Sequence, residues 1–169
     1  PINCHIFAEI VHESGLPAGV FNVVNGAGAE IGQALAAHPQ VDMVSLTGSS
    51  DTGKFIMRSA ADSLKRVHLE LGGKAPLIVF ADADIERAAE KAAFGGFINS
   101  GHDCTAATRI LVHESVKEKF TEALLAQAQA FKVGQPFDEG VMMGPLISAK
   151  QLERVAGFVE RAKAAGAKA

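Results

Sequence analysis

Cysteine is scarce in this chain, with only Cys4 and Cys104 among 169 residues. The two lie far apart and form no C-x-x-C motif, which excludes a disulfide framework and favours a reducing compartment. We therefore expect a cytoplasmic protein. The six histidines form no H-x-x-x-H pair and no Cys/His cluster, so we expect no metal site.

Strong charge of one sign and long apolar runs are also missing. The net charge of -3 is mild and no Lys/Arg run stands out, so we expect neither a nucleic acid nor an anionic membrane as partner. No apolar run approaches the ~20 residues that a membrane-spanning helix needs. The 48% apolar and 21% charged residues are typical of a soluble globular protein, with room for one domain or parts of two.

Both ends of the sequence suggest a piece of a longer protein. Pro1 is not an initiator Met, and no signal peptide precedes the first apolar helix. The final stretch, LERVAGFVERAKAAGAKA, stops just past a helix, where a strand would be expected next. We expect the natural chain to continue beyond these residues.

Helical and strand patterns alternate along the chain. Strands are expected at VFNVV, VDMVSL, RVHLEL, PLIVF and RILVHE, and helices at 2–12, up to Leu35, 54–61, 82–99, 115–131 and near the C-terminus. Asp82 or Asp84 is expected to cap the fourth helix, and Ser115 the fifth, with Glu118 at its capping-box position. This alternation predicts an α/β fold with a parallel sheet covered on both faces.

The glycine pair in LGGKAP interrupts this alternation of helices and strands and could act as an elbow between domains. We place a domain boundary there, between residues 1–72 and 73–169.

Two glycine-containing turns could approach a phosphate. Gly26, Gly28 and Gly32 form G-x-G-x-x-x-G after a strand, which fits either a dinucleotide turn or an ordinary tight turn. In LTGSSDTGK a strand leads through small residues and hydroxyls into a helix, where free amides favour a phosphate. The alternative for this second turn is a plain N-cap, and the spacing does not match a Walker A loop.

Glu70 and Cys104 are the two candidate catalytic residues. Glu70 ends a strand beside the glycine pair, where a carboxylate could act as a general base or simply be solvated. Cys104 follows Gly101-His102-Asp103 in an expected turn, whose amides could stabilise a thiolate and an oxyanion. Taken alone, Cys104 fits a small buried hydrophobic residue better than a nucleophile.

Together these stretches resemble the NAD(P)+-dependent aldehyde dehydrogenase superfamily. SLTGSSDTGK is similar to its cofactor turn, LELGGKAP to its glutamate motif and NSGHDCTAATR to its cysteine motif, in the same order and with a fitting Glu70-to-Cys104 spacing. GLPAGVFNVVNG and VGQPFDEGVMMGPLIS extend the resemblance over the whole chain. It implies the parallel-sheet fold of that family, with residues 1–72 ending the cofactor domain and 73–169 beginning the catalytic domain.

The resemblance also implies roles for these residues. Cys104 would be the nucleophile that forms a thiohemiacetal and then a thioester, and Glu70 would activate the water that hydrolyses it to a carboxylic acid. NAD or NADP would be the cofactor, and the parent enzyme a homo-oligomer. The residues expected at the cofactor are Gly48, Ser49, Ser50, Asp51, Thr52, Gly53, Leu71 and Gly72.

Some positions differ from the family pattern or refine it. His102 stands where the family nearly always has Gln, and Asp103 resembles aminoaldehyde and betaine-aldehyde relatives, whose substrates are cationic. Further family elements, including the ribose clamp and a second oxyanion donor, lie outside these residues. The alternative function is therefore a truncated, catalytically inactive derivative kept for structure or binding.

Overall fold

The computed structural model describes residues 2–168. The chain divides after Leu71 into two compact units, each with its own pair of strands and its own helices.

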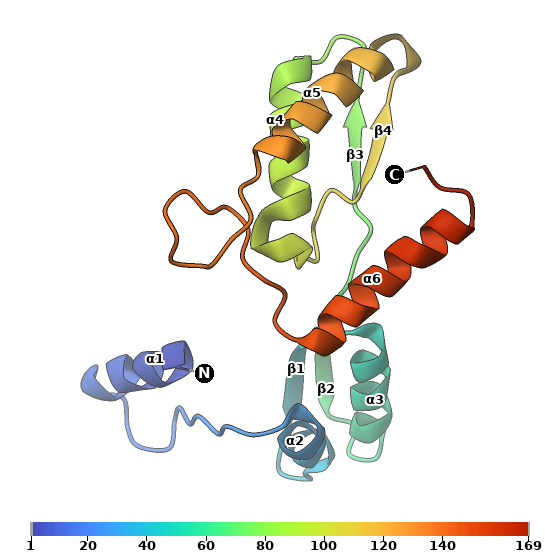
Figure 1. Ribbon diagram of the computed structural model, residues 1–169. Coiled ribbons are helices and arrows are strands. Elements are labelled where there is room, and N and C mark those ends of the chain that lie inside the picture. The colour runs from blue at the N-terminus through green and yellow to red at the C-terminus, as the bar shows by residue number, and fades with distance from the viewer. Residues whose placement is uncertain (1, 169) are drawn as a thin grey trace. The chain divides into compact units, whose positions relative to one another are not determined.

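The first unit is built around two parallel strands joined by a helix. Its elements are α1 (Ile2–Glu13), one π-helical turn (Gly28–Gly32), α2 (Gln33–Ala37), β1 (Met43–Gly48), α3 (Ser50–Ala61) and β2 (Arg66–Leu71). β1 and β2 pair in parallel, with Ser45 opposite His68 and Thr47 opposite Glu70. Figure 1 shows the two strands side by side, with α3 next to them.

Alternation along β1 and β2 separates an apolar face from a polar one. Val44, Leu46, Val67 and Leu69 are partly buried, and the residues between them are exposed. α3 contacts both strands and buries Ile56 and Ala60. The polar residues of the strands, Glu70 among them, therefore lie on the opposite face.

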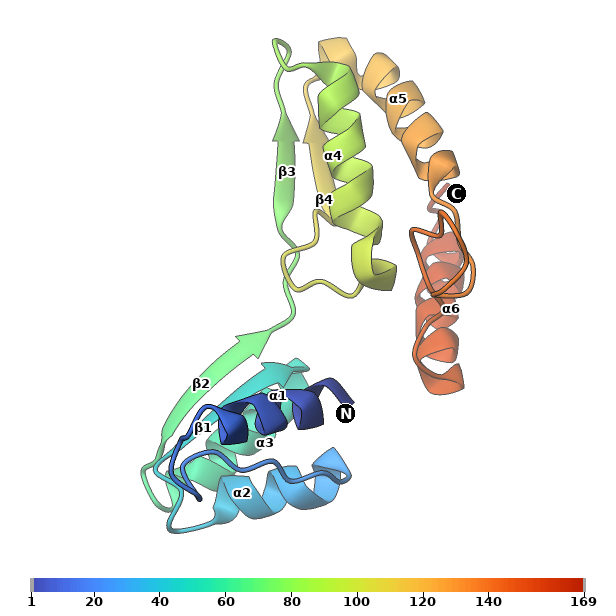
Figure 2. The same ribbon diagram turned by 90° about the vertical axis from the view of Figure 1, so that its left-hand side faces the viewer.

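The second unit repeats this plan. Its elements are β3 (Pro76–Val79), α4 (Ile85–Phe97), a turn (Ile98–Gly101), β4 (Arg109–Val112), a 3-10 turn (Glu114–Val116), α5 (Lys117–Ala130) and α6 (Ala149–Ala164). β3 and β4 pair in parallel, α4 contacts β3, and α5 packs along α4. This arrangement of α4 and α5 beside the strand pair is seen in Figure 2.

Phe120 of α5 is the largest buried side chain of the hydrophobic cluster in this unit and is only 2% exposed. The buried residues of this cluster are Val79, Ile85, Ala89, Ala92 and Phe120. Alanines at three-residue spacing on α4 leave room for the ring, because a larger side chain would keep the two helices apart. On the far face of the strand pair, Ile78 and Leu111 are 57% and 51% exposed.

The α/β fold with parallel strands is confirmed, but the strand expected at VFNVV is wrong. Residues 20–24 have no regular structure, and Val20 and Val24 are largely exposed. A strand is stabilised by ladder hydrogen bonds, and none of the described strands pairs with this segment. Apolar content alone therefore misled the prediction.

The cap predictions had mixed outcomes. Asp84 caps α4, because its Oδ1 accepts a hydrogen bond from the Arg87 amide at 3.2 Å. The Ser115 capping box is wrong: α5 begins at Lys117, and Ser115 lies in the preceding 3-10 turn. There the imidazole Nδ1 of His113 accepts from the Ser115 amide, so the histidine takes the capping role.

We expect Phe120→Ala to lower the free energy of unfolding by about 3–5 kcal/mol, because it leaves a cavity in a packed cluster. The matched control is Phe137→Ala, at a fully exposed phenylalanine (101%), which should change stability little. Chemical denaturation of the natural full-length protein measures both. Equal destabilisation by the two variants would contradict this account of the core.

Candidate active site

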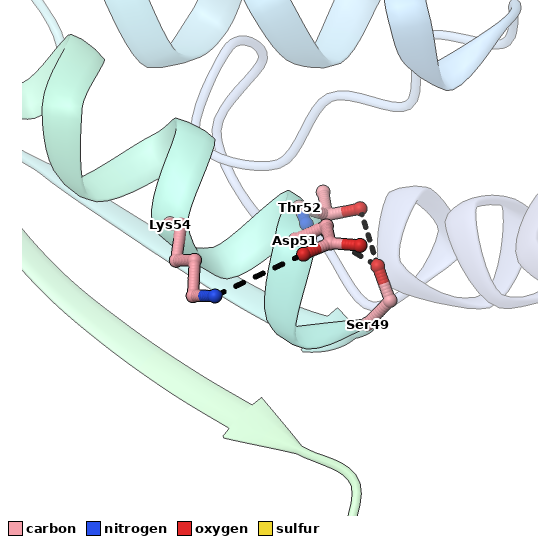
Figure 3. A network of polar contacts seen from close by, with 4 residues as sticks. All are labelled: Ser49, Asp51, Thr52 and Lys54. Atoms are coloured by element: carbon pink, nitrogen blue, oxygen red, sulfur yellow. Dashed lines mark hydrogen bonds and ion pairs between the residues drawn. The ribbon is translucent and has the colours of Figure 1, made fainter.

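The turn from β1 into α3 is an N-terminal cap built by Ser49. Its Oγ accepts a hydrogen bond from the Thr52 amide at 3.2 Å and lies 2.9 Å from the Thr52 hydroxyl (Figure 3). The backbone of Ser49 is extended (φ -79°, ψ 154°), as an N-cap requires. Asp51 and Lys54 approach at 4.0 Å, but both are highly exposed, so this pair adds little stability.

This turn fits an anionic group through its backbone. The amides of Ser50 and Asp51 precede the first helical hydrogen bond, from Gly53 to Ser49, and point out of the helix start. Gly53 is buried, and a Cβ there would lie 3.0 Å from a methyl of Leu71. Glycine therefore lets α3 pack closely on β2, which is the role of the last glycine in dinucleotide turns.

Glu70 lies on the exposed face of β2, next to His68. One carboxylate oxygen, Oε1, is 3.2 Å from His68 Nε2, and both side chains are a little over half exposed. Oε2 makes no hydrogen bond to the described residues. His68 in turn contacts Ser45 across the strands at 3.0 Å.

Cys104 is an exposed free thiol in a tight turn. The turn closes through a hydrogen bond from the Ala106 amide to the Asp103 carbonyl at 3.2 Å. Asp103 Oδ1 accepts from both the amide and the hydroxyl of Thr105, each at 2.8 Å. Within residues 2–168 the amide of Cys104 donates to no partner, so it is free to bind an oxyanion.

The Thr105 contacts set the charge of Asp103. The hydrogen bond from the Thr105 backbone, followed by the one from its side chain, lowers the pKa of the Asp103 carboxyl below its usual value of 3.8. At neutral pH the residue next to Cys104 is therefore an ionised carboxylate.

The chain enters this turn through left-handed backbone. After α4, Asn99, Ser100 and Gly101 have φ values of 53°, 57° and 74°. The Ser100 hydroxyl donates to the Gly144 carbonyl at 2.9 Å, and the Asn99 side-chain amide donates to the His102 carbonyl at 2.9 Å. His102 Nε2 lies 3.4 Å from the Gln151 amide nitrogen, so the described partner of its ring is α6, not Cys104.

Gly73 touches the backbone of the cysteine turn. A Cβ at position 73 would lie 2.6 Å from the Cys104 carbonyl oxygen, whereas one at Gly72 would meet nothing within 4 Å. The glycine expected to serve as an elbow therefore allows a close approach of two backbones. Glycine is required there because the neighbouring atom belongs to the main chain and cannot rotate away.

The predicted site residues divide between the two units. Gly48 to Gly53, Glu70 and Leu71 belong to the first unit, and Gly72 and Cys104 to the second. His68 and Gly73 were not predicted to support the candidate catalytic residues. The sequence pattern could have indicated His68, because residues two apart on a strand lie on the same face. No local sequence pattern indicates the contact of Gly73 with the cysteine turn.

Two open hollows lie elsewhere, each within one unit. One, of about 650 Å³, is lined by β3, β4 and α5, and the other, of about 620 Å³, by α1 and residues 21–24 with Leu35. Neither is lined by Cys104 or Glu70.

No three His, Cys, Asp or Glu side chains in residues 2–168 are grouped to hold a metal ion. None of the helices described is both long and apolar enough to cross a membrane.

Known proteins match this chain along its whole length. The model of the aldehyde dehydrogenase family matches residues 1–169. The chloroplastic betaine aldehyde dehydrogenase of Amaranthus hypochondriacus is 46% identical over 166 residues, which are 98% of this chain and 33% of that protein.

Two solved structures are similar. Betaine aldehyde dehydrogenase from Staphylococcus aureus, in complex with NAD+, is 43% identical with a TM-score of 0.89, over 95% of this chain and 32% of that one. A variant of aldehyde dehydrogenase C from Pseudomonas syringae, complexed with NAD+ and octanal, is 39% identical with a TM-score of 0.94, over 99% and 35%. The chain thus spans about a third of the length of these relatives. It belongs to the aldehyde dehydrogenase family.

Proposed function

We propose that these residues belong to an enzyme that oxidises an aldehyde to a carboxylic acid, with NAD(P)+ as the electron acceptor. The observation that carries this proposal is Cys104, an exposed thiol in a turn where its own backbone amide is free. A nucleophile and an oxyanion donor within one residue suit attack on a carbonyl.

In the first step the Cys104 thiolate adds to the aldehyde carbon. The C=O π electrons move to oxygen, and the Cys104 amide stabilises the resulting oxyanion of the thiohemiacetal. NAD(P)+, when bound, supplies the hydride acceptor that the oxidation needs. Once oxidised, the acyl group remains on Cys104 as a thioester.

Glu70 is proposed as the general base of the second step. Its free Oε2 takes a proton from water while the water oxygen attacks the thioester carbon. The carbon–sulfur bond then breaks, which releases the carboxylic acid and restores the Cys104 thiol. A strand-borne carboxylate with one oxygen beside His68 and the other open suits this task.

The cofactor would be held chiefly by the turn into α3. The free amides of Ser50 and Asp51 suit its pyrophosphate, and close packing at Gly53 supports that turn. Leu71 and Gly72 would contact the nicotinamide side through their backbone. In this proposal residues 1–72 end the cofactor domain and 73–169 begin the catalytic domain.

Asp103 favours a positively charged aldehyde. Its carboxylate is ionised and adjacent to the nucleophile, and only Oδ1 is used by Thr105. A trimethylammonium or aminium group on the substrate would be attracted to it. We therefore propose an aldehyde of the betaine-aldehyde or aminoaldehyde class as substrate.

Two further expectations belong to this proposal. Cys4 and Cys104 are both free, which suits a reducing compartment such as the cytoplasm. The homo-oligomer that the family resemblance implies stays a prediction.

We expect Cys104→Ser to lower NADH formation by more than about 10³-fold, because a serine hydroxyl is a far weaker nucleophile. The matched control is Cys4→Ser, at the other exposed cysteine, which should retain full activity. Glu70→Gln should slow decay of the acyl-enzyme by about 10²-fold while its formation is little changed. Rapid-quench mass spectrometry of the natural full-length protein with NAD+ and betaine aldehyde separates the two steps.

Two results would contradict this assignment. Wild-type turnover by the Cys104→Ser protein would show that Cys104 is not the nucleophile. A wild-type protein that shows no Cys104-dependent NADH formation would favour the inactive derivative.

We expect Gly73→Ala to reduce kcat/KM by roughly 10²-fold, because the new methyl group would displace the Cys104 carbonyl and shift the nucleophile. Gly96→Ala in α4, where a Cβ meets nothing within 4 Å, is the control and should leave kcat/KM unchanged. The alkylation rate of Cys104 by iodoacetamide provides a second readout. Wild-type kcat/KM and alkylation rates in both variants would contradict this role of Gly73.

We expect Asp103→Asn to raise the KM for betaine aldehyde about tenfold, because the carboxylate charge is lost. The KM for neutral octanal should change by less than about twofold, because the asparagine oxygen can still accept from Thr105 and keep the turn. Steady-state kinetics with both aldehydes measures this difference. An equal rise for the two aldehydes would indicate a damaged turn and no charge recognition.

A further inference from the structure

The open face of β1 and β2 carries a connected row of polar side chains. Ser45 Oγ lies 3.0 Å from His68 Nδ1, and His68 Nε2 lies 3.2 Å from Glu70 Oε1. Ser45 and His68 are register partners in the parallel ladder, and Glu70 follows His68 by two positions on the same face. The strand pairing therefore aligns the three groups.

The two contacts determine how His68 presents its ring to Glu70. When the imidazole is neutral, the Ser45 hydroxyl donates to Nδ1, and the Nε2 proton lies beside the carboxylate. When the imidazole is protonated, Nδ1–H donates to Ser45 Oγ, and the imidazolium forms an ion pair with Glu70 Oε1. In both states Nε2 carries a proton beside Glu70 Oε1, because Ser45 can reverse its role.

We propose that His68 is a positioning residue for Glu70, with Ser45 orienting its ring; this inference depends on the proposed role of Glu70 as the base. His68 occupies Oε1 and leaves Oε2 for the hydrolytic water. Acyl-enzyme formation does not use this carboxylate oxygen, so only hydrolysis should depend on His68.

Among the described β1 and β2 residues on this face, Arg66, two positions before His68, carries a charge beside Glu70. The β1 residues on the same face, Met43, Ser45 and Thr47, carry no charge. α3 packs on the opposite face of the two strands, through the side that buries Ile56 and Ala60. A general charge effect on Glu70 would thus come from Arg66, which provides a control.

The test measures formation and decay of the Cys104 thioester in the natural full-length protein, by rapid-quench mass spectrometry with NAD+ and betaine aldehyde. His68→Leu should slow decay about tenfold, as expected for a lost polar contact with a charged group, with formation unchanged. His68→Gln should restore decay to within about threefold of wild type, because its amide can donate from a similar position. Arg66→Gln, the matched control, should leave both rates within about twofold of wild type.

Coupling to Glu70 separates positioning from structural damage. In a Glu70→Gln background, His68→Leu should have no further effect on decay, since there is no carboxylate left to position. Additive effects of the two changes, or equal decay rates in His68→Leu and His68→Gln, would overturn the inference. So would a matching loss in thioester formation.

The Glu70→Gln protein distinguishes failure of the His68 proposal from failure of the Glu70 proposal. When Glu70→Gln slows decay but His68→Leu does not, only the positioning role of His68 is wrong. When Glu70→Gln leaves decay unchanged, Glu70 is not the base, and both proposals fail.

Discussion

Parallel pairing of short strands is the constraint on which each unit depends. Parallel neighbours cannot be joined by a tight turn, so α3 and α4 each carry the chain back to start the next strand in the same direction. Because side chains alternate between the two faces of a strand, one face of each strand pair packs against a helix. In the first unit this leaves Glu70 and His68 on the open face, and a shift of one residue in β2 would turn both toward α3.

The sequence predicted most of this framework, because strong local signals coincide with it. The four observed strands and the helices between them appear as apolar runs, caps and glycines within a few residues of their true bounds. Residues 20–24 carry an equally apolar run but no described strand to pair with. Ser115 is a good N-cap residue, yet His113 supplies the bond instead. Both errors concern partners that a local pattern does not specify.

The candidate site shows the same division between local and distant information. Cys104 and Glu70 could be selected from motifs, and the tight turn around Cys104 follows from its Gly, His and Asp neighbours. The contact between Gly73 and the Cys104 carbonyl joins two segments far apart in the chain, so no local pattern reveals it. Ser45 and His68 meet only through the register of β1 and β2, which the sequence does not state.

The left-handed backbone before Cys104 limits which residues this loop can accept. Three consecutive residues, Asn99 to Gly101, adopt positive φ, a region that β-branched side chains avoid and that Asn and Gly tolerate. The side-chain bonds of Asn99 and Ser100 offset part of the strain. Conservation of Asn99 and Gly101 among relatives would therefore be explained by backbone geometry alone, independently of the chemistry of the neighbouring thiol.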